Sequence, residues 1–291
     1  MAQKTVLITG TSTGIGATTA EHLAKAGWKV YAGVRKADDG ARLVEAIDGD
    51  IVPVILDVTK AQDIANVVKQ IDSDVGSLHG LVNNAGIPVA SPVELTTDEA
   101  WRWPFEVNFF GAVNLTREAM PLVDRVDGRF VHVGSIACRV SGVAQSPYSA
   151  TKHALVAFNW SLRAELQRNT GMNSSLIEPG GTKTAIVDKA NGLIDDLNRM
   201  IDSADRRGRY QFVVDGFKGF VKEGFAKAVE PDHCAKAIEH ALTAKRPKAR
   251  YLVGPDAKVA GHFVTKMPDR IRERMDLALA KKFEKSGRAL P

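Results

Sequence analysis

The sequence predicts an α/β protein built on one parallel, doubly wound sheet of about seven strands, with helices on both faces. Short apolar runs rich in β-branched residues, which are typical of buried strands, alternate along the chain with segments of helical periodicity. Strands separated by helices form right-handed β-α-β crossovers, and these produce a parallel sheet. Polar or glycine residues follow several of the runs, at the place where such a sheet binds ligands. We therefore expect a single domain over residues 1–291.

The expected strands are spread over the whole chain. They cover residues 5–9, 29–33, 51–56, 80–86, 129–134, 173–178 and 250–254. Pro53 has no backbone N–H, so the third strand is expected to have an irregular start. Helices are expected between the strands, among them residues 61–74 and one long helix over 97–124. Pro104 would be tolerated in the long helix only near its first turn or at a kink.

The composition is that of a soluble globular protein, with 44% hydrophobic and 25% charged residues. Cys138 and Cys234 lie far apart and in no ligand pattern, so we expect neither a disulfide nor a metal site. We find no signal peptide and no apolar stretch of about twenty residues, so we expect a cytoplasmic protein with no membrane-spanning helix. The net charge of +5 is mild and the short basic clusters contain no interleaved aromatic residues, which argues against nucleic-acid binding.

A glycine-rich turn follows the first strand and precedes a helix. Its pattern is Gly10-x-x-x-Gly14-x-Gly16. Glycines let the backbone approach a pyrophosphate, and the helix N-terminus offers free N–H groups and positive potential. The pattern alone could also be a turn with a close helix–strand contact. Between a strand and a helix, it predicts nucleotide binding on a Rossmann-type sheet.

The end of the second strand carries no acidic residue. At this place, nineteen residues after Gly16, a carboxylate would hold the ribose hydroxyls of NAD, but the sequence reads Val34-Arg35-Lys36. Val34 cannot hydrogen-bond a ribose, whereas Arg35 and Lys36 offer positive charge to a 2′-phosphate. The two basic residues could also be an ordinary solvated pair. Together with the missing carboxylate, they favour NADP(H) as the cofactor.

Tyr148 and Lys152 carry the predicted chemistry. Their spacing of four residues puts a phenol beside an ammonium on one face of a helix. A free tyrosine titrates near pH 10, and a neighbouring positive charge lowers its pKa toward neutrality. Ser135, at the end of a strand, can hydrogen-bond the same substrate oxygen. Such a pair is common by chance, but it gains weight because four residues end strands at the same predicted edge, Gly10, Asp57, Asn84 and Ser135.

The motifs together resemble the short-chain dehydrogenase/reductase family in its classical form. They stand in the family's order and at its spacings: Thr9-Gly10-x-x-x-Gly14-x-Gly16, Asn83-Asn-Ala-Gly86, Asn108, Ser135, Tyr148-x-x-x-Lys152 and Pro179-Gly180. The resemblance is strong over residues 4–185 and looser in the remainder. These six ordered elements together are a specific signal, which none of them is alone.

The resemblance implies four catalytic residues. Tyr148 would be the general acid or base, and Lys152 would lower the pKa of Tyr148 and hold the nicotinamide ribose. Ser135 would orient the substrate oxygen. Asn108 would kink its helix and hold a water that links Lys152 to solvent. The nicotinamide would carry out the hydride chemistry, and the protein would position it.

The resemblance also implies a set of cofactor-binding residues. They would contact the phosphates, the adenine, the ribose and the carboxamide of the cofactor, and Tyr148 and Lys152 would lie at its nicotinamide end. In this order the others are Gly10, Ser12, Thr13, Gly14, Ile15, Gly16, Arg35, Asp57, Val58, Asn84, Ala85, Gly86, Pro179, Gly180, Thr182 and Thr184. Thr182 stands where many members have valine or isoleucine, but a backbone contact there should survive the change.

Residues 185–229 interrupt the strand–helix rhythm directly after the nicotinamide motif. They carry two apolar stripes: Ile186, Leu193, Ile194, Leu197, Met200 and Ile201, then Phe212, Val213, Phe217, Phe220, Val221 and Phe225. Two amphipathic helices in this place predict a substrate lid, although they could also be ordinary helices that pack on the core. A basic amphipathic tail at 256–291 could lie on a membrane surface, complete the lid or pack on a partner subunit, and packing is favoured.

The sequence segments at residues 31–35 and 250–257 resemble those of the branch that includes 17β-hydroxysteroid and retinol dehydrogenases. We therefore expect an NADP(H)-dependent oxidoreductase that interconverts a secondary alcohol and a carbonyl on a lipophilic, steroid- or retinoid-like substrate. A general reductase of small ketones and aldehydes is the alternative, and a non-enzymatic NADP-binding sensor is a third reading. The expected assembly is a homodimer or homotetramer.

Overall fold

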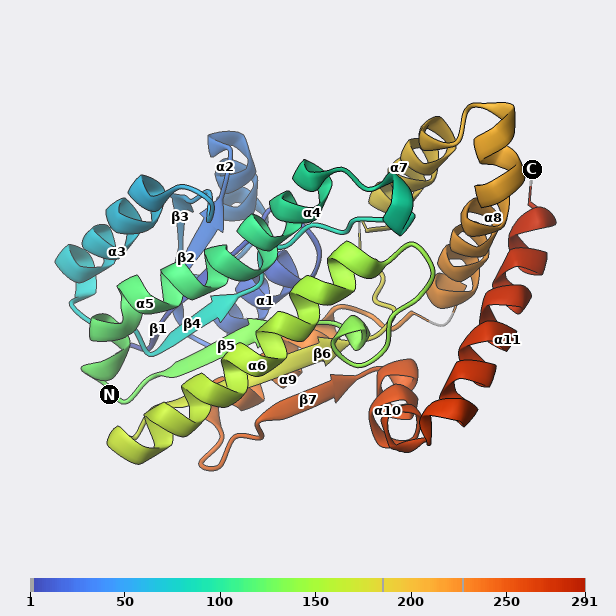
Figure 1. Cartoon of the computed structure of the whole chain (residues 1–291). Coiled ribbons are helices and arrows are strands. Elements are labelled where there is room, and N and C mark those ends of the chain that lie inside the picture. Colours follow the sequence, from blue (N-terminus) through green and yellow to red (C-terminus); the bar gives the residue numbers. More distant parts are fainter. Residues whose placement is uncertain (1–2, 185, 227, 291) are drawn as a thin grey trace.

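The protein, seen here in a computed structural model, is described over residues 3–184, 186–226 and 228–290, apart from the side chains of residues 169, 186–190 and 225. Seven parallel strands form one sheet in the order β3-β2-β1-β4-β5-β6-β7 (Figure 1). They are β1 (Thr5–Thr9), β2 (Lys29–Val34), β3 (Ile51–Ile55), β4 (Gly80–Asn83), β5 (Arg129–Val133), β6 (Asn173–Pro179) and β7 (Arg250–Val253). The predicted α/β fold with a parallel, doubly wound sheet is confirmed.

The strand order reverses beside β1. The chain builds β2 and β3 on one side of β1, then returns to place β4 on its other side and continues outward to β7. In open α/β sheets, ligands bind at the carboxyl ends of the strands where the order reverses. Gly10 follows β1 and Asn84 follows β4, so both lie at this reversal point.

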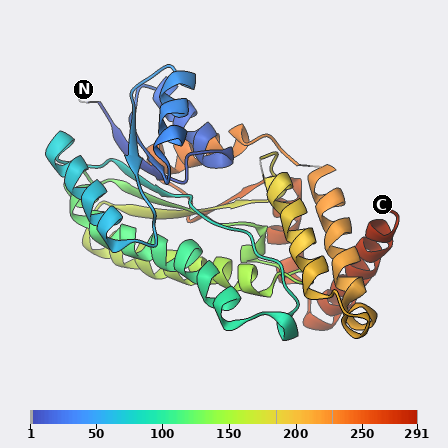
Figure 2. The same ribbon diagram turned by 90° about the horizontal axis from the view of Figure 1, so that it is seen from above.

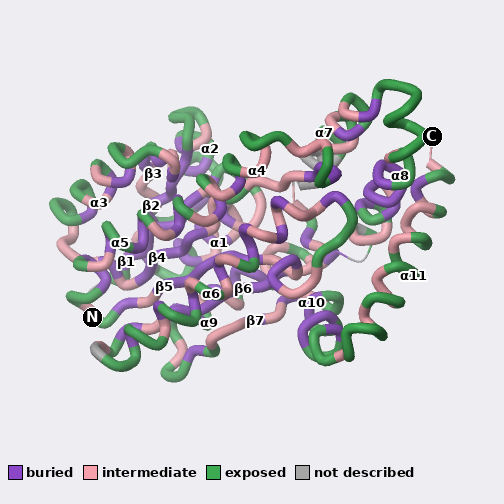
Figure 3. Tube along the Cα trace, in the orientation of Figure 1, coloured by how far each residue is buried: buried purple, intermediate pink, exposed green. Residues whose placement is uncertain are grey.

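Helices cover both faces of the sheet and bury two apolar cores. On one face lie α1 (Gly14–Lys25), α2 (Ala37–Ala46) and α9 (Asp232–Thr243), and on the other lie α3 (Ala61–Val75), α5 (Gly111–Asp124) and α6 (Ser146–Asn169). Leu23 and Ile238 are fully buried in the first core, and Ile71 and Leu115 in the second. Figure 3 shows this burial along the strands, with exposed positions on the outer sides of the helices.

Pro53 fits its strand without the irregular start that was expected. β3 is an edge strand that pairs only with β2. The N–H of Leu56 donates to the carbonyl of Val34, and because backbone groups alternate between the two sides of a strand, the nitrogen of Pro53 faces the free edge. The expectation was wrong because the sequence does not reveal which strand lies at an edge.

The long helix expected over residues 97–124 is one helical run with a π-helical turn inside it. α4 (Asp98–Phe105) passes into a π turn at Glu106–Phe110 and then into α5. Thr97 caps the start, since its side chain accepts a hydrogen bond from the N–H of Ala100. Pro104 lies just before the π turn, so the run departs from α-helical geometry directly after the proline.

Four helices stand beyond the carboxyl edge of the sheet (Figures 1 and 2). They are α7 (Ile186–Met200), α8 (Ala204–Ala226), α10 (Pro255–His262) and α11 (Asp269–Arg288). α7 and α8 share an apolar cluster with two loops of the sheet edge: it contains Leu197, Ile201, Val213, Val214, Phe217 and Val221, together with Ala90 and Ala144. Phe212 and Phe220 lie outside this cluster and are 47% and 37% exposed, contrary to the predicted stripe. The side chains of Ile186 and Phe225 fall outside the described part of the chain.

The C-terminal helix α11 packs against α8. A Cβ atom at Gly219 would lie 1.9 Å from the carbonyl oxygen of Phe283, so the two backbones are in direct contact there. An ion pair between Lys282 and Glu223 supports the same contact. Of the three arrangements considered for the tail, this contact is the one in which the tail joins the 185–229 segment predicted as a lid, and packing on a partner subunit stays a prediction. Among the helices of the described residues, none is long and apolar enough to cross a membrane.

Candidate active site

Ser135, Tyr148 and Lys152 come together at the carboxyl edge of the sheet. Ser135 follows β5 and begins a short 3₁₀ turn, where its Oγ accepts a hydrogen bond of 3.1 Å from the N–H of Ala137. Tyr148 and Lys152 lie one turn apart on α6, with Lys152 Nζ 5.7 Å from the centre of the Tyr148 ring. A hydrogen bond with the Ser135 side chain acts to lower the pKa of Tyr148. The predicted trio is thus one contiguous group.

Lys152 is buried and its ammonium is fixed by the backbone. Its Nζ donates a hydrogen bond of 3.0 Å to the carbonyl oxygen of Val133, two residues before Ser135. A Cβ atom added at Gly86 would lie 3.6 Å from this ammonium and 3.2 Å from Oδ1 of Asn108. The absence of a side chain at Gly86 therefore leaves space beside both residues.

Asn108 lies inside the π turn and joins the loop after β4 to α6. Its Oδ1 accepts a hydrogen bond of 2.7 Å from the N–H of Ile87, and its Nδ2 donates to the carbonyl of Ile87 at 3.0 Å and to Oγ1 of Thr151 at 3.1 Å. Thr151 in turn donates to the backbone carbonyl of Tyr148 at 2.7 Å. The helix departs from regular geometry at Asn108, as expected. Its role in holding a water stays a prediction.

The pKa of Tyr148 moves in the opposite direction from the expected one. Burial raises it to about 12, which outweighs the lowering by the Ser135 hydrogen bond, and the nearby Cys138 thiol adds to the rise. Burial also lowers the pKa of Lys152. The ammonium of Lys152 points to the carbonyl of Val133, and burial of the Tyr148 phenol has the largest effect on its pKa. The phenol is therefore protonated at neutral pH, the form that can donate a proton to a carbonyl oxygen.

The glycine-rich turn is built for close backbone approach. Gly10 and Gly14 have φ angles of +68° and +63°, in the left-handed region that favours glycine. A Cβ atom at Gly16 would lie 2.3 Å from the carbonyl oxygen of Gly10. Ser12 and Thr13 are exposed in this turn directly before α1, and Ile15 packs against the core. These features fit a pyrophosphate beside the N-terminus of α1.

Asn84 locks the glycine turn to the end of β4. Its Nδ2 donates to the carbonyls of Thr9 at 2.9 Å and Gly10 at 3.0 Å. Oγ1 of Thr9 accepts hydrogen bonds from the N–H groups of Asn84 at 3.0 Å and Ala85 at 2.9 Å. The amide of Asn84 is therefore turned toward the protein, which sequence reasoning, with its emphasis on the ribose, did not foresee.

Arg35 is exposed at the end of β2 and faces the end of β3. Burial acts to raise the pKa of Asp57, but hydrogen bonds from the hydroxyl and N–H of Thr59, with the nearby Lys60 and Arg35, lower it overall. Asp57 Oδ1 accepts from Thr59 N at 3.1 Å and from Oγ1 at 2.7 Å. Val58 is buried against α5. Arg35, Asp57 and Val58 thus share the region predicted for the adenosine half of a dinucleotide.

The Pro179–Thr184 motif meets the glycine turn from the other side. A Cβ atom at Gly14 would lie 3.2 Å from Cβ of Thr184. Thr182 is buried and forms an isolated β-bridge with Val229. Pro179 ends β6, and Gly180 donates its N–H to the carbonyl of Val253 at 2.9 Å. The motif predicted for the carboxamide end of the dinucleotide and the glycine turn predicted for its pyrophosphate therefore lie side by side.

Two residues that support the site were missed by sequence reasoning. Asp256 accepts a hydrogen bond of 2.7 Å from the N–H of Gly181, and a Cβ atom at Gly180 would lie 1.9 Å from its Oδ1. The thiol of Cys138 donates to the carbonyl of Lys152 at 3.2 Å and accepts from the N–H of Ser135 at 3.4 Å. The contact of Asp256 depends on long-range packing, and the cysteine at position 138 belongs to no motif that the sequence analysis used.

No group of three or more histidine, cysteine, aspartate or glutamate side chains that could hold a metal ion is found within residues 3–184, 186–226 and 228–290. The residues present fit a nicotinamide dinucleotide instead. Glycines leave room beside the turn and beside Lys152, and hydrogen-bonding groups line the edge between Gly10 and Thr184.

Comparison with known proteins agrees with this geometry. The sequence model of the family described as short chain dehydrogenase matches residues 4–192. Human dehydrogenase/reductase SDR family member 9 is 30% identical over 93% of this chain and 86% of its own length. Bovine mitochondrial D-beta-hydroxybutyrate dehydrogenase is 32% identical over 85% and 76%. Bovine 17-beta-hydroxysteroid dehydrogenase type 6 is 31% identical over 88% and 82%.

Solved structures show the same fold. A short-chain dehydrogenase from Streptomyces avermitilis has a TM-score of 0.75 at 25% identity and covers 100% of this chain and 99% of its own. An enzyme of the family from Burkholderia phymatum, in complex with NAD, has a TM-score of 0.75 at 20% identity over 94% and 95%. Actinorhodin polyketide ketoreductase with NADPH has a TM-score of 0.71 at 23% identity over 90% and 98%. The chain belongs to the short-chain dehydrogenase/reductase family, in the branch of the steroid and retinol dehydrogenases, and is an oxidoreductase of CH–OH groups that uses a nicotinamide dinucleotide.

Proposed function

We propose that this chain is an NADP(H)-dependent oxidoreductase that interconverts a secondary alcohol and a carbonyl on a lipophilic substrate. The observation that carries the proposal is the hydrogen-bonded pair of Ser135 and Tyr148 beside the buried ammonium of Lys152, next to the glycine turn. A phenol, a hydroxyl and an ammonium in this arrangement can exchange a proton with a substrate oxygen.

In the direction of reduction, Tyr148 donates its phenolic proton to the carbonyl oxygen. Ser135 donates a hydrogen bond to the same oxygen when its hydroxyl hydrogen turns from Tyr148 to the substrate, while its Oγ keeps the hydrogen bond that it accepts from Ala137. The cofactor, when bound, supplies the hydride for reduction or accepts it in oxidation. Lys152 stabilises the phenolate that proton donation leaves, and it holds the nicotinamide ribose. Asn108 fixes α6 through Thr151 and so keeps Tyr148 in place.

Arg35 supports NADP(H) as the preferred cofactor. Its guanidinium is exposed at the end of β2, and the position holds no carboxylate that would bind the ribose hydroxyls of NAD or repel a 2′-phosphate. Ser12, Thr13 and the glycines would take the pyrophosphate, Asp57 and Val58 the adenine, and residues 179–184 the carboxamide end. The related structures contain NAD in one case and NADPH in another, so the choice is specific to each member.

The 185–229 segment supports a lipophilic substrate. The apolar cluster of α7 and α8 includes Ala90, four residues after Gly86, and Ala144, four residues before Tyr148. The cluster therefore touches both loops that border the proposed reaction centre, which is the place of a substrate lid. One relative is named for hydroxysteroids, which agrees with a bulky apolar substrate.

A small polar substrate is the second candidate. The bovine relative named for D-beta-hydroxybutyrate is 32% identical to this chain, so a small hydroxy acid or ketone acid belongs in any test. A screen of androstane-3,17-dione, retinal, acetoacetate and cyclohexanone with NADPH and NADH, followed by absorbance at 340 nm, separates the candidates. Turnover of androstane-3,17-dione or retinal with NADPH supports the proposal, and turnover of acetoacetate alone supports the second candidate. If none of the four carbonyl compounds is reduced with NADPH or NADH, both candidate functions are contradicted.

Location and assembly remain predictions. We propose a cytoplasmic homodimer or homotetramer, as expected from the family resemblance. One bovine relative is named as mitochondrial, so location varies among relatives. Size-exclusion chromatography with light scattering measures the assembly directly, and a single monomer peak at micromolar concentration would contradict it.

A further inference from the structure

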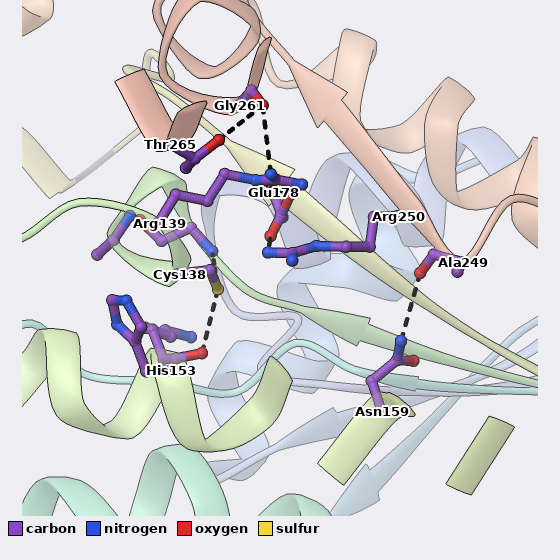
Figure 4. A network of polar contacts seen from close by, with 12 residues as sticks. Cys138, Arg139, His153, Asn159, Glu178, Ala249, Arg250, Gly261 and Thr265 are labelled. Carbon is purple, nitrogen blue, oxygen red and sulfur yellow. Dashed lines mark hydrogen bonds and ion pairs between the residues drawn. The ribbon is translucent and has the colours of Figure 1, made fainter. Parts of the chain in front are cut away.

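A buried carboxylate lies behind the proposed reaction centre. Glu178, the residue of β6 directly before Pro179, is completely buried and lies between two guanidinium groups (Figure 4). Arg139 donates from Nε to Oε2 of Glu178 at 2.8 Å, and Arg250 of β7 contacts Oε1. A buried carboxylate with two charged partners is a rigid joint, because leaving it unpaired would be costly.

Arg139 is held by the C-terminal part of the chain as well. Its Nη1 lies 3.5 Å from the carbonyl oxygen of Gly261 in α10, and its own carbonyl accepts a hydrogen bond of 3.1 Å from Arg272 of α11. Side chain and backbone of Arg139 are therefore fixed at the same time. Arg250 differs in this respect, since its contact with Glu178 joins only the neighbouring strands β6 and β7.

Arg139 ends the turn that begins with Ser135. Its N–H donates to the carbonyl of Ile136 at 2.9 Å, and the preceding Cys138 joins the same turn to the backbone of Lys152. At its other end, Gly134 alone separates Ser135 from β5, and the Ser135 side chain is hydrogen-bonded to Tyr148. The position of the Ser135 hydroxyl therefore depends on how both ends of this five-residue turn are held.

We propose that Arg139 is a positioning residue for Ser135. Glu178 fixes the guanidinium of Arg139, and contacts with α10 and α11 fix its Nη1 and its backbone carbonyl. The C-terminal segment thereby takes part in the reaction centre without touching the substrate. This inference rests on the proposed function, because it assigns a role to the turn that carries Ser135. A buried ion pair is by itself weak evidence for stability, since apolar replacements are often as stable. The role that we assign to the Arg139–Glu178 pair is therefore the orientation of Ser135 and not stability.

The chain offers a matched pair of variants for the test. Arg139→Met and Arg250→Met each remove one partner of Glu178 and leave the other in place. If Arg139 positions Ser135, kcat falls by about tenfold or more in Arg139→Met, since a misplacement of about 1 Å can lower a rate by about 10²-fold. In Arg250→Met, kcat stays within about threefold of wild type. The dissociation constant of NADPH, measured by fluorescence, stays unchanged in both.

The pH profile supplies a readout that a merely structural role would not move. The hydrogen bond from Ser135 lowers the pKa of Tyr148, so its loss raises that pKa further. The pH dependence of alcohol oxidation should therefore shift to higher pH in Arg139→Met and stay unchanged in Arg250→Met. The assay uses whichever of androstane-3,17-dione, retinal and acetoacetate the wild type turns over fastest, and the corresponding alcohol for oxidation.

Arg139→Lys and Arg250→Lys keep the positive charge beside Glu178 and provide the comparison if the methionine variants do not fold. Arg139→Lys is expected to recover part of the lost kcat, because one ammonium can reach Glu178 but cannot also reach Gly261. Equal losses in the two positions, or a wild-type kcat and pH profile in Arg139→Met, overturn the inference. If Tyr148→Phe keeps its turnover, the proposed function itself has failed; if it does not and the arginine variants behave alike, only this inference has.

Discussion

The ammonium of Lys152 donates a hydrogen bond of 3.0 Å to the carbonyl oxygen of Val133. This bond joins α6 to the end of β5, two residues before Ser135, and it orients Lys152 while leaving its remaining hydrogens for other partners. The two elements that carry the proposed proton donor and its hydrogen-bond partner are thereby held together by the residue that would stabilise the phenolate.

Lys152→Met should lower turnover and cofactor affinity together. Turnover should fall by about 10²-fold or more, because proton transfer in a positioned site contributes about 10²–10⁴-fold. NADPH binding should weaken by roughly tenfold, since a hydrogen bond to a charged group contributes about 1.5–3 kcal/mol. Steady-state kinetics and fluorescence titration measure the two effects. Unchanged NADPH affinity would show that Lys152 does not hold the ribose.

Alcohol oxidation should become faster as the pH rises. Burial raises the pKa of Tyr148 to about 12, so below that value the phenolate that accepts a proton is a small fraction, and it grows about tenfold per pH unit. Carbonyl reduction uses the protonated phenol, which is present throughout the neutral range. We therefore expect kcat/KM for oxidation to increase steadily from pH 6 to pH 10 while that for reduction stays nearly flat. An oxidation profile that levels off below pH 8 would disagree with a raised pKa.

Arg35→Ala should separate the two cofactors. The exposed guanidinium would pair with a 2′-phosphate, so its loss should weaken NADPH binding by roughly 10- to 100-fold, the equivalent of about 1.5–3 kcal/mol for a hydrogen bond to a charged group. NADH has no such phosphate, and its dissociation constant should change by less than about twofold. Lys69→Ala, at an exposed cation of α3, is the control and should leave both dissociation constants unchanged. Equal effects of Arg35→Ala on NADPH and NADH would contradict a role in phosphate binding.

Two glycines of α8 give opposite predictions for stability. A Cβ atom at Gly219 would lie 1.9 Å from the carbonyl oxygen of Phe283, so Gly219→Ala must push α11 away and should cost about 1–3 kcal/mol. A Cβ atom at Gly216 would meet nothing within 4 Å, so Gly216→Ala should stabilise the helix by up to about 1 kcal/mol. Thermal unfolding measures both. A Gly219→Ala protein as stable as wild type would show that α11 does not pack closely on α8.

Features that depend on local sequence were predictable. The strand ends at Gly10 and Ser135 follow from short apolar runs, and the juxtaposition of Tyr148 and Lys152 follows from helical spacing. The doubly wound order follows from the alternation of strands and helices. These predictions needed no knowledge of which distant segments meet.

Features that depend on long-range packing were not predictable. Glu178 precedes a known motif, but only the fold brings Arg139 and Arg250 to it. The position of Pro53 at a free edge and the exposure of Phe212 depend on which elements are neighbours. The pKa of Tyr148 is raised because the effect of burial exceeds the effect of nearby charge. The spacing of residues in the sequence predicts which charges are close, but it does not predict burial.

The most direct test of the account is the rate of carbonyl reduction by Tyr148→Phe. This change removes the proton donor and keeps the ring, so turnover should fall by about 10²–10⁴-fold while NADPH binding stays within about threefold of wild type. Tyr251→Phe, which alters a tyrosine bonded to His240 and Lys248 away from the site, should keep its turnover and serves as the control. Wild-type turnover by Tyr148→Phe would contradict the proposed proton transfer.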